Sequence, residues 1–130
     1  MADAPHIMIV ESRYYEEIAQ ELITSVIKEL DDAGATYERF EVPGAFEIPT
    51  AIKYAIRSMD VDSAHERFDG YIALGCVIRG QTSHYDYVCG ESARGLQDLA
   101  LQYALAIGYG ILTVENWDQA MARAKRSEQD

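Results

Sequence analysis

One stretch of the sequence limits the choice of fold more than any other: Gly70–Ile78 reads GYIALGCVI and is almost continuously apolar. A strand with one exposed face alternates apolar and polar residues, whereas a strand of a parallel sheet is covered on both faces and is apolar throughout. The run is also much shorter than the ~20 apolar residues that a membrane-spanning helix needs. The stretch therefore predicts the central strand of a parallel sheet.

The rest of the chain alternates short apolar runs with longer amphipathic stretches, a pattern typical of βαβ units. The runs that predict the other strands are His6–Val10, Thr36–Val42 and Ile107–Val114. The stretches that predict helices are Glu16–Asp32 before Gly34, a segment beginning near Pro49, Ser83–Tyr103, and a short helix capped by Asn116 that runs to about Lys125, while Asp60–Asp69 is a predicted polar loop. Because parallel neighbours need crossover helices, we expect an α/β three-layer sandwich, with a four-stranded parallel sheet and helices on both faces. A chain of 130 residues has room for one such domain, spanning residues 1–130.

Charge and cysteine content exclude several functions. The chain has 11 Lys and Arg residues against 22 Asp and Glu residues, a formal net charge of −11, which disfavours general binding to nucleic acid or to anionic lipid. Cys76 and Cys89 form no CxxC pair and have no clustered His partner, so neither a disulfide framework nor a zinc site is predicted. The start of the chain lacks the basic region of a secretory signal, and we expect a cytoplasmic protein with reduced thiols.

The segment RGQTSHYD follows the central strand and leads into a predicted helix. Ligands of open parallel sheets bind beyond the carboxyl ends of the strands, so functional residues are expected here. Gly80 allows close approach of the backbone, and the amides of Gln81, Thr82 and Ser83 at the helix start favour an anion such as phosphate. Ser83 and Asp86 also have the spacing of a capping box, so the alternative is that Ser83 only caps the helix.

His84 lies in the first turn of that predicted helix. The positive end of the helix dipole disfavours the imidazolium form, and a neutral imidazole can accept a proton and return it. His84 is therefore a candidate general acid and base. The alternative is an ordinary surface or capping histidine.

Three further residues are weaker candidates when each is considered alone. Tyr14 follows the first strand and could stack on a planar ligand, although aromatic residues are more often part of a core. Glu47 lies in the bend PGAFEIP and could accept hydrogen bonds from the hydroxyls of a ligand. Arg123 could bind an anion through its planar guanidinium, although a single arginine on a helix is usually solvated.

Three segments taken together resemble lumazine synthases: VPGAFEIPTAIKYA, ALGCVIRGQTSHYDYVCGESARGL and IGYGILTVENWDQAMARA. The resemblance covers nearly the whole chain, and the order and spacing of these patterns on successive βα units make it specific. It implies a flavodoxin-like lumazine synthase fold and a condensation of 5-amino-6-(D-ribitylamino)uracil with 3,4-dihydroxy-2-butanone 4-phosphate to 6,7-dimethyl-8-ribityllumazine, in riboflavin biosynthesis. It implies no metal and no organic cofactor.

The resemblance also implies roles for individual residues. Tyr14 and Tyr109 would flank the pyrimidine ring, at positions where the family commonly has other aromatic residues. His84 would carry the protons. The remaining implied contacts are Ala45, Phe46 and Glu47 with the ribityl chain and ring, Cys76, Val77 and Ile78 with the pyrimidine through backbone groups, and Gln81, Thr82 and Arg123 with the phosphate.

The resemblance further implies a homo-oligomer, a pentamer or a larger pentamer-based shell, with active sites between subunits. Family members usually continue with a lysine-containing segment and a further helix, whereas this sequence ends in KRSEQD. Two hypotheses therefore stand beside each other, an active lumazine synthase and a shell or scaffold subunit with little or no activity. A phosphoacceptor receiver domain is disfavoured, because Glu11-Ser12 and Cys76-Val77 occupy the places where it needs its acidic residues.

Overall fold

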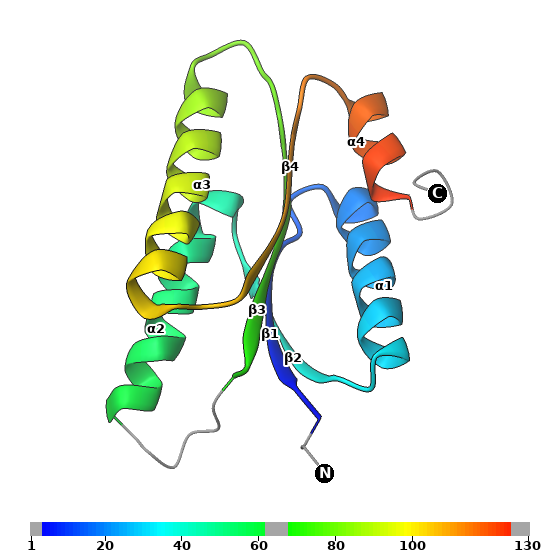
Figure 1. The fold of residues 1–130 in the computed structure, drawn as a ribbon. Coiled ribbons are helices and arrows are strands. Elements are labelled where there is room, and N and C mark those ends of the chain that lie inside the picture. The colour runs from blue at the N-terminus through cyan, green and yellow to red at the C-terminus, as the bar shows by residue number, and fades with distance from the viewer. Residues whose placement is uncertain (1–3, 62–67, 126–130) are drawn as a thin grey trace.

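The computed structural model describes residues 4–61 and 68–125. It contains a four-stranded parallel sheet in the order β2-β1-β3-β4. Figure 1 shows helices α2 and α3 on one face of this sheet and α1 and α4 on the other. The predicted α/β three-layer sandwich is confirmed.

The strands lie where apolar runs predicted them, with one correction. They are β1 (His6–Ser12), β2 (Thr36–Val42), β3 (Gly70–Ile78) and β4 (Ile107–Val114). The predicted end of β1 at Val10 is wrong, because Glu11 and Ser12 continue the parallel pairing opposite Glu41 and Val42 of β2. Both residues are buried despite their polar side chains, and a pattern based on hydropathy ends the strand too early.

The helices are α1 (Glu16–Asp32), the short 3₁₀ helix η1 (Ala45–Glu47), α2 (Ile48–Val61), α3 (His84–Tyr103) and α4 (Trp117–Ala124). Helix α2 includes two residues of the predicted loop Asp60–Asp69; residues 62–67 of that loop, and residues 126–130 of the ending KRSEQD, lie outside the described part of the chain. Gly34 follows α1 with a φ of +73°, a left-handed conformation that glycine adopts without strain. None of the described helices is long and apolar enough to cross a membrane.

Both faces of the sheet are covered by apolar side chains. Met8 and Val10 of β1 pack with α2 and α3, whereas Ile9 points to the opposite face and packs with Ile23 of α1. Strand β3 lies between β1 and β4 and carries buried residues on both faces, which confirms its predicted central place.

The strand order also locates a place for a ligand. The chain runs from β1 outward to β2, and then crosses back to place β3 on the other side of β1 and β4 beyond it. The crossovers after β1 and β3 therefore diverge, and in open parallel sheets this switch point leaves a crevice at the carboxyl ends of the strands.

Candidate active site

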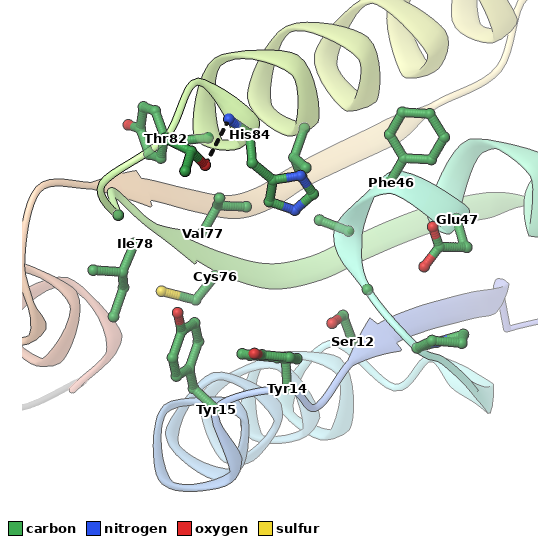
Figure 2. A pocket seen from close by; sticks show the side chains of 16 residues that line it. Ser12, Tyr14, Tyr15, Phe46, Glu47, Cys76, Val77, Ile78, Thr82 and His84 are labelled. Atoms are coloured by element: carbon green, nitrogen blue, oxygen red, sulfur yellow. Dashed lines mark hydrogen bonds between the residues drawn. The ribbon is translucent and has the colours of Figure 1, made fainter.

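A cleft of about 550 Å³ lies at the carboxyl ends of β1, β2 and β3. Its volume is in the range of sites that bind small molecules. Figure 2 shows Tyr14 and Tyr15 on the side of the β1–α1 junction and His84 at the start of α3 on the opposite side. Residues from three separate strand-to-helix junctions thus meet in one concave surface.

Most of the residues predicted to form the site lie in this cleft. They are Tyr14, Ala45, Phe46, Glu47, Cys76, Val77, Ile78, Thr82 and His84. The parallel direction of the strands explains the convergence, because it brings their carboxyl ends to one edge of the sheet.

Gln81, Tyr109 and Arg123 do not line the cleft of this chain. Gln81 is exposed beside Thr82, and Tyr109 is about half exposed on β4. Arg123 is exposed on α4, where its Nη1 donates a hydrogen bond to the carbonyl oxygen of Gln119 at 3.0 Å. Tyr109 lies on the outer strand β4 and Arg123 on the short last helix α4, and neither lines the cleft that contains His84.

The β1–α1 junction presents aromatic surface to the cleft. Tyr14 is 75% exposed, and its ring contacts the ring of Tyr15 edge to face at a centroid distance of 4.9 Å. Tyr15 in turn packs edge to face against Trp117 of α4 at 6.1 Å. The ring of Tyr14 is thus largely exposed, is in contact with Tyr15, and is free to stack on a planar ligand.

The bend between β2 and α2 brings Phe46 and Glu47 to the cleft. A Cβ added at Gly44 would lie 3.2 Å from Oε1 of Glu47, so a side chain there would displace the carboxylate. Ala45 is buried, and Phe46 is about half exposed at the cleft. Glu47 lines the cleft, and its role toward a ligand stays a prediction.

The start of α3 differs from the predicted capping arrangement. The side chain of Ser83 makes no capping hydrogen bond, and its backbone is already helical, with φ −72° and ψ 0°. A capping side chain needs an extended backbone to reach the amides of the next turn. Asn116 at the start of α4 has such a backbone, and its side chain accepts a hydrogen bond from the Gln119 N–H at 2.9 Å. At α3 it is Thr82 whose Oγ1 accepts a hydrogen bond, from the His84 N–H at 3.3 Å. The alternative in which Ser83 only caps the helix is therefore wrong.

The imidazole of His84 points into the cleft, across from Ser12 and Tyr14 (Figure 2). It is exposed at the first residue of α3, where water and a ligand can both reach it. This position suits a group that exchanges protons with a bound molecule.

The thiol of Cys76 lines the cleft, in surroundings that disfavour its thiolate form. Burial, reinforced by the nearby Cys89, raises the pKa of Cys76 to about 11, so the thiol is protonated at neutral pH. Because the thiolate is the reactive form, covalent catalysis by this residue is disfavoured. Both Cys76 and Cys89 are free thiols. Among residues 4–61 and 68–125, no group of three or more His, Cys, Asp or Glu side chains is placed to hold a metal ion.

The cleft also contains residues that the sequence did not indicate as part of a site. Ser12 is a buried polar residue at the end of β1, and Tyr85 and Val88 come from the first turns of α3. Val88 follows His84 by four residues, so a helical repeat from the candidate histidine would have found it. Ser12 has no such signal, because its strand had been predicted to end at Val10.

The chain has clear similarity to known proteins. The sequence model of the family described as 6,7-dimethyl-8-ribityllumazine synthase matches residues 4–130. The 6,7-dimethyl-8-ribityllumazine synthase of Agrobacterium fabrum is 51% identical over 126 residues, which are 97% of this chain and 84% of the relative. The enzyme named 6,7-dimethyl-8-ribityllumazine synthase 1 from Rhizobium meliloti is 53% identical over 125 residues, 96% of this chain and 80% of the relative. The chain therefore belongs to the 6,7-dimethyl-8-ribityllumazine synthase family.

Proposed function

We propose that this protein condenses 5-amino-6-(D-ribitylamino)uracil with 3,4-dihydroxy-2-butanone 4-phosphate to 6,7-dimethyl-8-ribityllumazine, with release of phosphate and water, as a step of riboflavin biosynthesis in the cytoplasm. The observation that carries the proposal is the meeting of Tyr14, Glu47 and His84 in one cleft. Their side chains supply a stacking surface, a carboxylate for hydroxyl groups and a proton carrier.

The pyrimidine and its ribityl chain bind at the junctions that follow β1 and β2. Tyr14 stacks on the ring, and Ala45 and Phe46 give the chain an apolar wall. Glu47 accepts hydrogen bonds from the ribityl hydroxyls. The backbone of Cys76–Ile78, which lines the cleft at the end of β3, pairs with the polar edge of the pyrimidine.

The phosphate binds at the start of α3, where backbone N–H groups and the helix dipole favour an anion. Gln81 and Thr82 contribute contacts there, and His84 moves protons in imine formation, in elimination of phosphate and in ring closure. Holding both reactants in one cleft supplies a further part of the acceleration through proximity.

The site is completed by a neighbouring subunit. Tyr109 and Arg123 are exposed and lie outside the cleft of their own chain. We assign them to the cleft of an adjacent copy, in which Tyr109 flanks the pyrimidine and Arg123 binds the phosphate. Such a contact joins two different surfaces of the chain, and repeating it around a closed ring completes every site. We propose five subunits for this ring, the number that the family resemblance implies, with a larger pentamer-based shell as its extension.

Mixing the protein with the two substrates and following the absorbance and fluorescence of the lumazine tests the proposed reaction. Product formation that needs both substrates is the expected result. An assembled protein that forms no product would support the alternative of a scaffold subunit.

Native mass spectrometry tests the shared site. The expected particle has five times the chain mass of 14.6 kDa, or a multiple of that pentamer. A monomer at micromolar concentration with full activity would contradict the assignment of Tyr109 and Arg123.

A further inference from the structure

A buried carboxylate precedes Ser12, the residue at the end of β1 that lines the cleft. Glu11, near the end of β1, is 3% exposed. An isolated carboxylate in such a place is costly, because burial disfavours the charged form. The reaction proposed above does not use the Glu11 carboxylate, so the burial of this charge needs another explanation.

Two guanidinium groups compensate this charge. The Nη1 of Arg13 donates to Oε1 of Glu11 at 2.8 Å, and the Nε of Arg39 on β2 donates to Oε2 at 2.8 Å. Each carboxylate oxygen therefore has its own cation. The side chain of Arg13 is 13% exposed and that of Arg39 is 42% exposed, so water screens the pair with Arg39 more strongly.

Arg13 is fixed by further partners on α1. Its Nε and Nη2 donate to Oε2 of Glu16 at 3.1 and 2.9 Å, and its Nη2 also donates to Oε1 of Gln20 at 3.0 Å. All three nitrogens of the guanidinium are thus used. The planar group has one geometry that satisfies these bonds, and it links the end of β1 to the first turns of α1.

Tyr14 follows Arg13 directly and has little else to hold it. With 75% of its surface exposed, its ring is placed by its backbone and by one edge contact with Tyr15. Tyr15 on the other side is partly buried against α4. The backbone of Tyr14 therefore lies between a residue anchored by ion pairs and a residue anchored by apolar packing.

From these contacts we infer that Glu11 is a positioning residue, which fixes through Arg13 the backbone from which Tyr14 reaches the pyrimidine. The inference rests on the proposed role of Tyr14. Glu11 does not touch the substrate, and its removal leaves the guanidinium of Arg13 partly buried without its strand partner. Binding of the pyrimidine should suffer, while binding of the phosphate substrate at the start of α3 should not.

A double-mutant cycle between Glu11→Gln and Tyr14→Ala tests the inference, because residues that act through one another are not additive. We expect Glu11→Gln to raise KM for the ribitylaminouracil about tenfold, which corresponds to ~1.4 kcal/mol of binding free energy. The kcat and the KM for the butanone phosphate should change less than about twofold, the result of lost ground-state binding of one substrate. In the Tyr14→Ala background, Glu11→Gln should add almost nothing to the same KM.

Asp32→Asn is the matched control. It removes the acidic partner of an exposed ion pair with Lys28, at 3.0 Å, at the far end of α1. Its kinetic constants should equal those of the wild type. If Glu11→Gln fails to fold, Arg13→Lys takes its place in the cycle, because it keeps the charge and loses the planar fork.

Four outcomes would count against the inference. A full effect of Glu11→Gln in the Tyr14→Ala background overturns it, and so does an equal rise of both KM values. Failure of both Glu11→Gln and Arg13→Lys to fold would show that the ion pairs serve stability alone. A wild-type protein that forms no lumazine would instead overturn the proposed function, and the role of Tyr14 with it.

Discussion

The junction between β1 and α1 and the junction between β3 and α3 border the same cleft, yet they are built differently. At the first, the guanidinium of Arg13 donates a hydrogen bond to the buried carboxylate of Glu11, and this ion pair fixes the chain at the end of β1. At the second, every residue from Arg79 to His84 is exposed. A Cβ added at Gly80 would meet no atom within 4 Å.

Arg79 makes the contrast clearer, because it is a charged residue at a strand end like Glu11. Its guanidinium stacks over the ring of Tyr85 at 4.3 Å and its Nε donates to Glu115 at 2.9 Å, so it turns toward the β4–α4 connection. It does not fill the cleft. Under the proposed function, the surface for the ring is formed before the substrate arrives, whereas the proposed anion site at the start of α3 is completed by the ligand and by the neighbouring subunit. A ring-binding surface that is already formed lowers the entropic cost of binding.

The largest effect on activity is expected at the exposed β3–α3 junction. His84→Ala should lower kcat by roughly 10–1000-fold, because the exposed imidazole is the proposed proton carrier. Its melting temperature should stay near that of the wild type, since the side chain is not part of a core. Steady-state kinetics and a thermal melt decide this, and an unchanged kcat would remove His84 from the mechanism.

At the β1–α1 junction, the main effect should be on the stability of the folded protein. Glu11→Gln should lower the free energy of unfolding by about 3 kcal/mol at neutral pH, as expected when one partner of a buried ion pair is removed. Asp32→Asn should leave it nearly unchanged. If urea denaturation gives equally small losses of unfolding free energy for the two variants, the ion pairs of Glu11 contribute no more than the exposed ion pair of Asp32.

The same residue predicts a pH dependence. Burial alone raises the pKa of Glu11, but hydrogen bonds and charges from Arg39 and Arg13 outweigh it, so the pKa lies below its ordinary value. A carboxylate of this kind stabilises the folded state above its ordinary pKa and loses that contribution as the pH falls through the lowered one. The difference in unfolding free energy between wild type and Glu11→Gln should therefore shrink in acid. A difference that is constant down to the acid transition would contradict the ion pairs.

The next effect concerns the anion site. Arg123→Ala should raise KM for the butanone phosphate about 10–100-fold, because a hydrogen bond to a charged group is lost. The KM for the pyrimidine should change much less, since Tyr14 and Glu47 remain in place. Kinetics with each substrate varied in turn measure this, and equal changes would point to a loss of assembly.

The smallest effect compares two helix starts. Asn116→Ala should cost about 1 kcal/mol of stability, because its side chain caps α4. Ser83→Ala should cost less than about 0.5 kcal/mol, because the Ser83 side chain makes no capping hydrogen bond. Chemical denaturation of both variants measures the difference. A larger loss for Ser83→Ala would mean that the start of α3 is capped after all.

Local patterns predicted the order of the elements, the central place of β3 and the end of α1 before Gly34. These features depend on neighbours in sequence: an unbroken apolar run, a stripe of apolar residues at helical spacing, and a glycine that adopts a positive φ. The same alternation placed Tyr14, Glu47 and His84 at strand ends, where a parallel sheet brings them together.

Other features were decided by the tertiary structure. Glu11 is buried because Arg39, 28 residues away, supplies a charge across the neighbouring strand. The alternative of a Ser83 cap at α3 was wrong because a backbone angle at Ser83 decides whether its side chain reaches an amide, and the residue type does not fix that angle. Arg123 was a weak candidate from its own chemistry and was assigned to the phosphate by the family resemblance, but its place outside the cleft follows from where β4 and α4 pack. Sequence patterns report interactions between near neighbours, whereas burial of a charge and convergence of a site depend on contacts that exist only once the chain has folded.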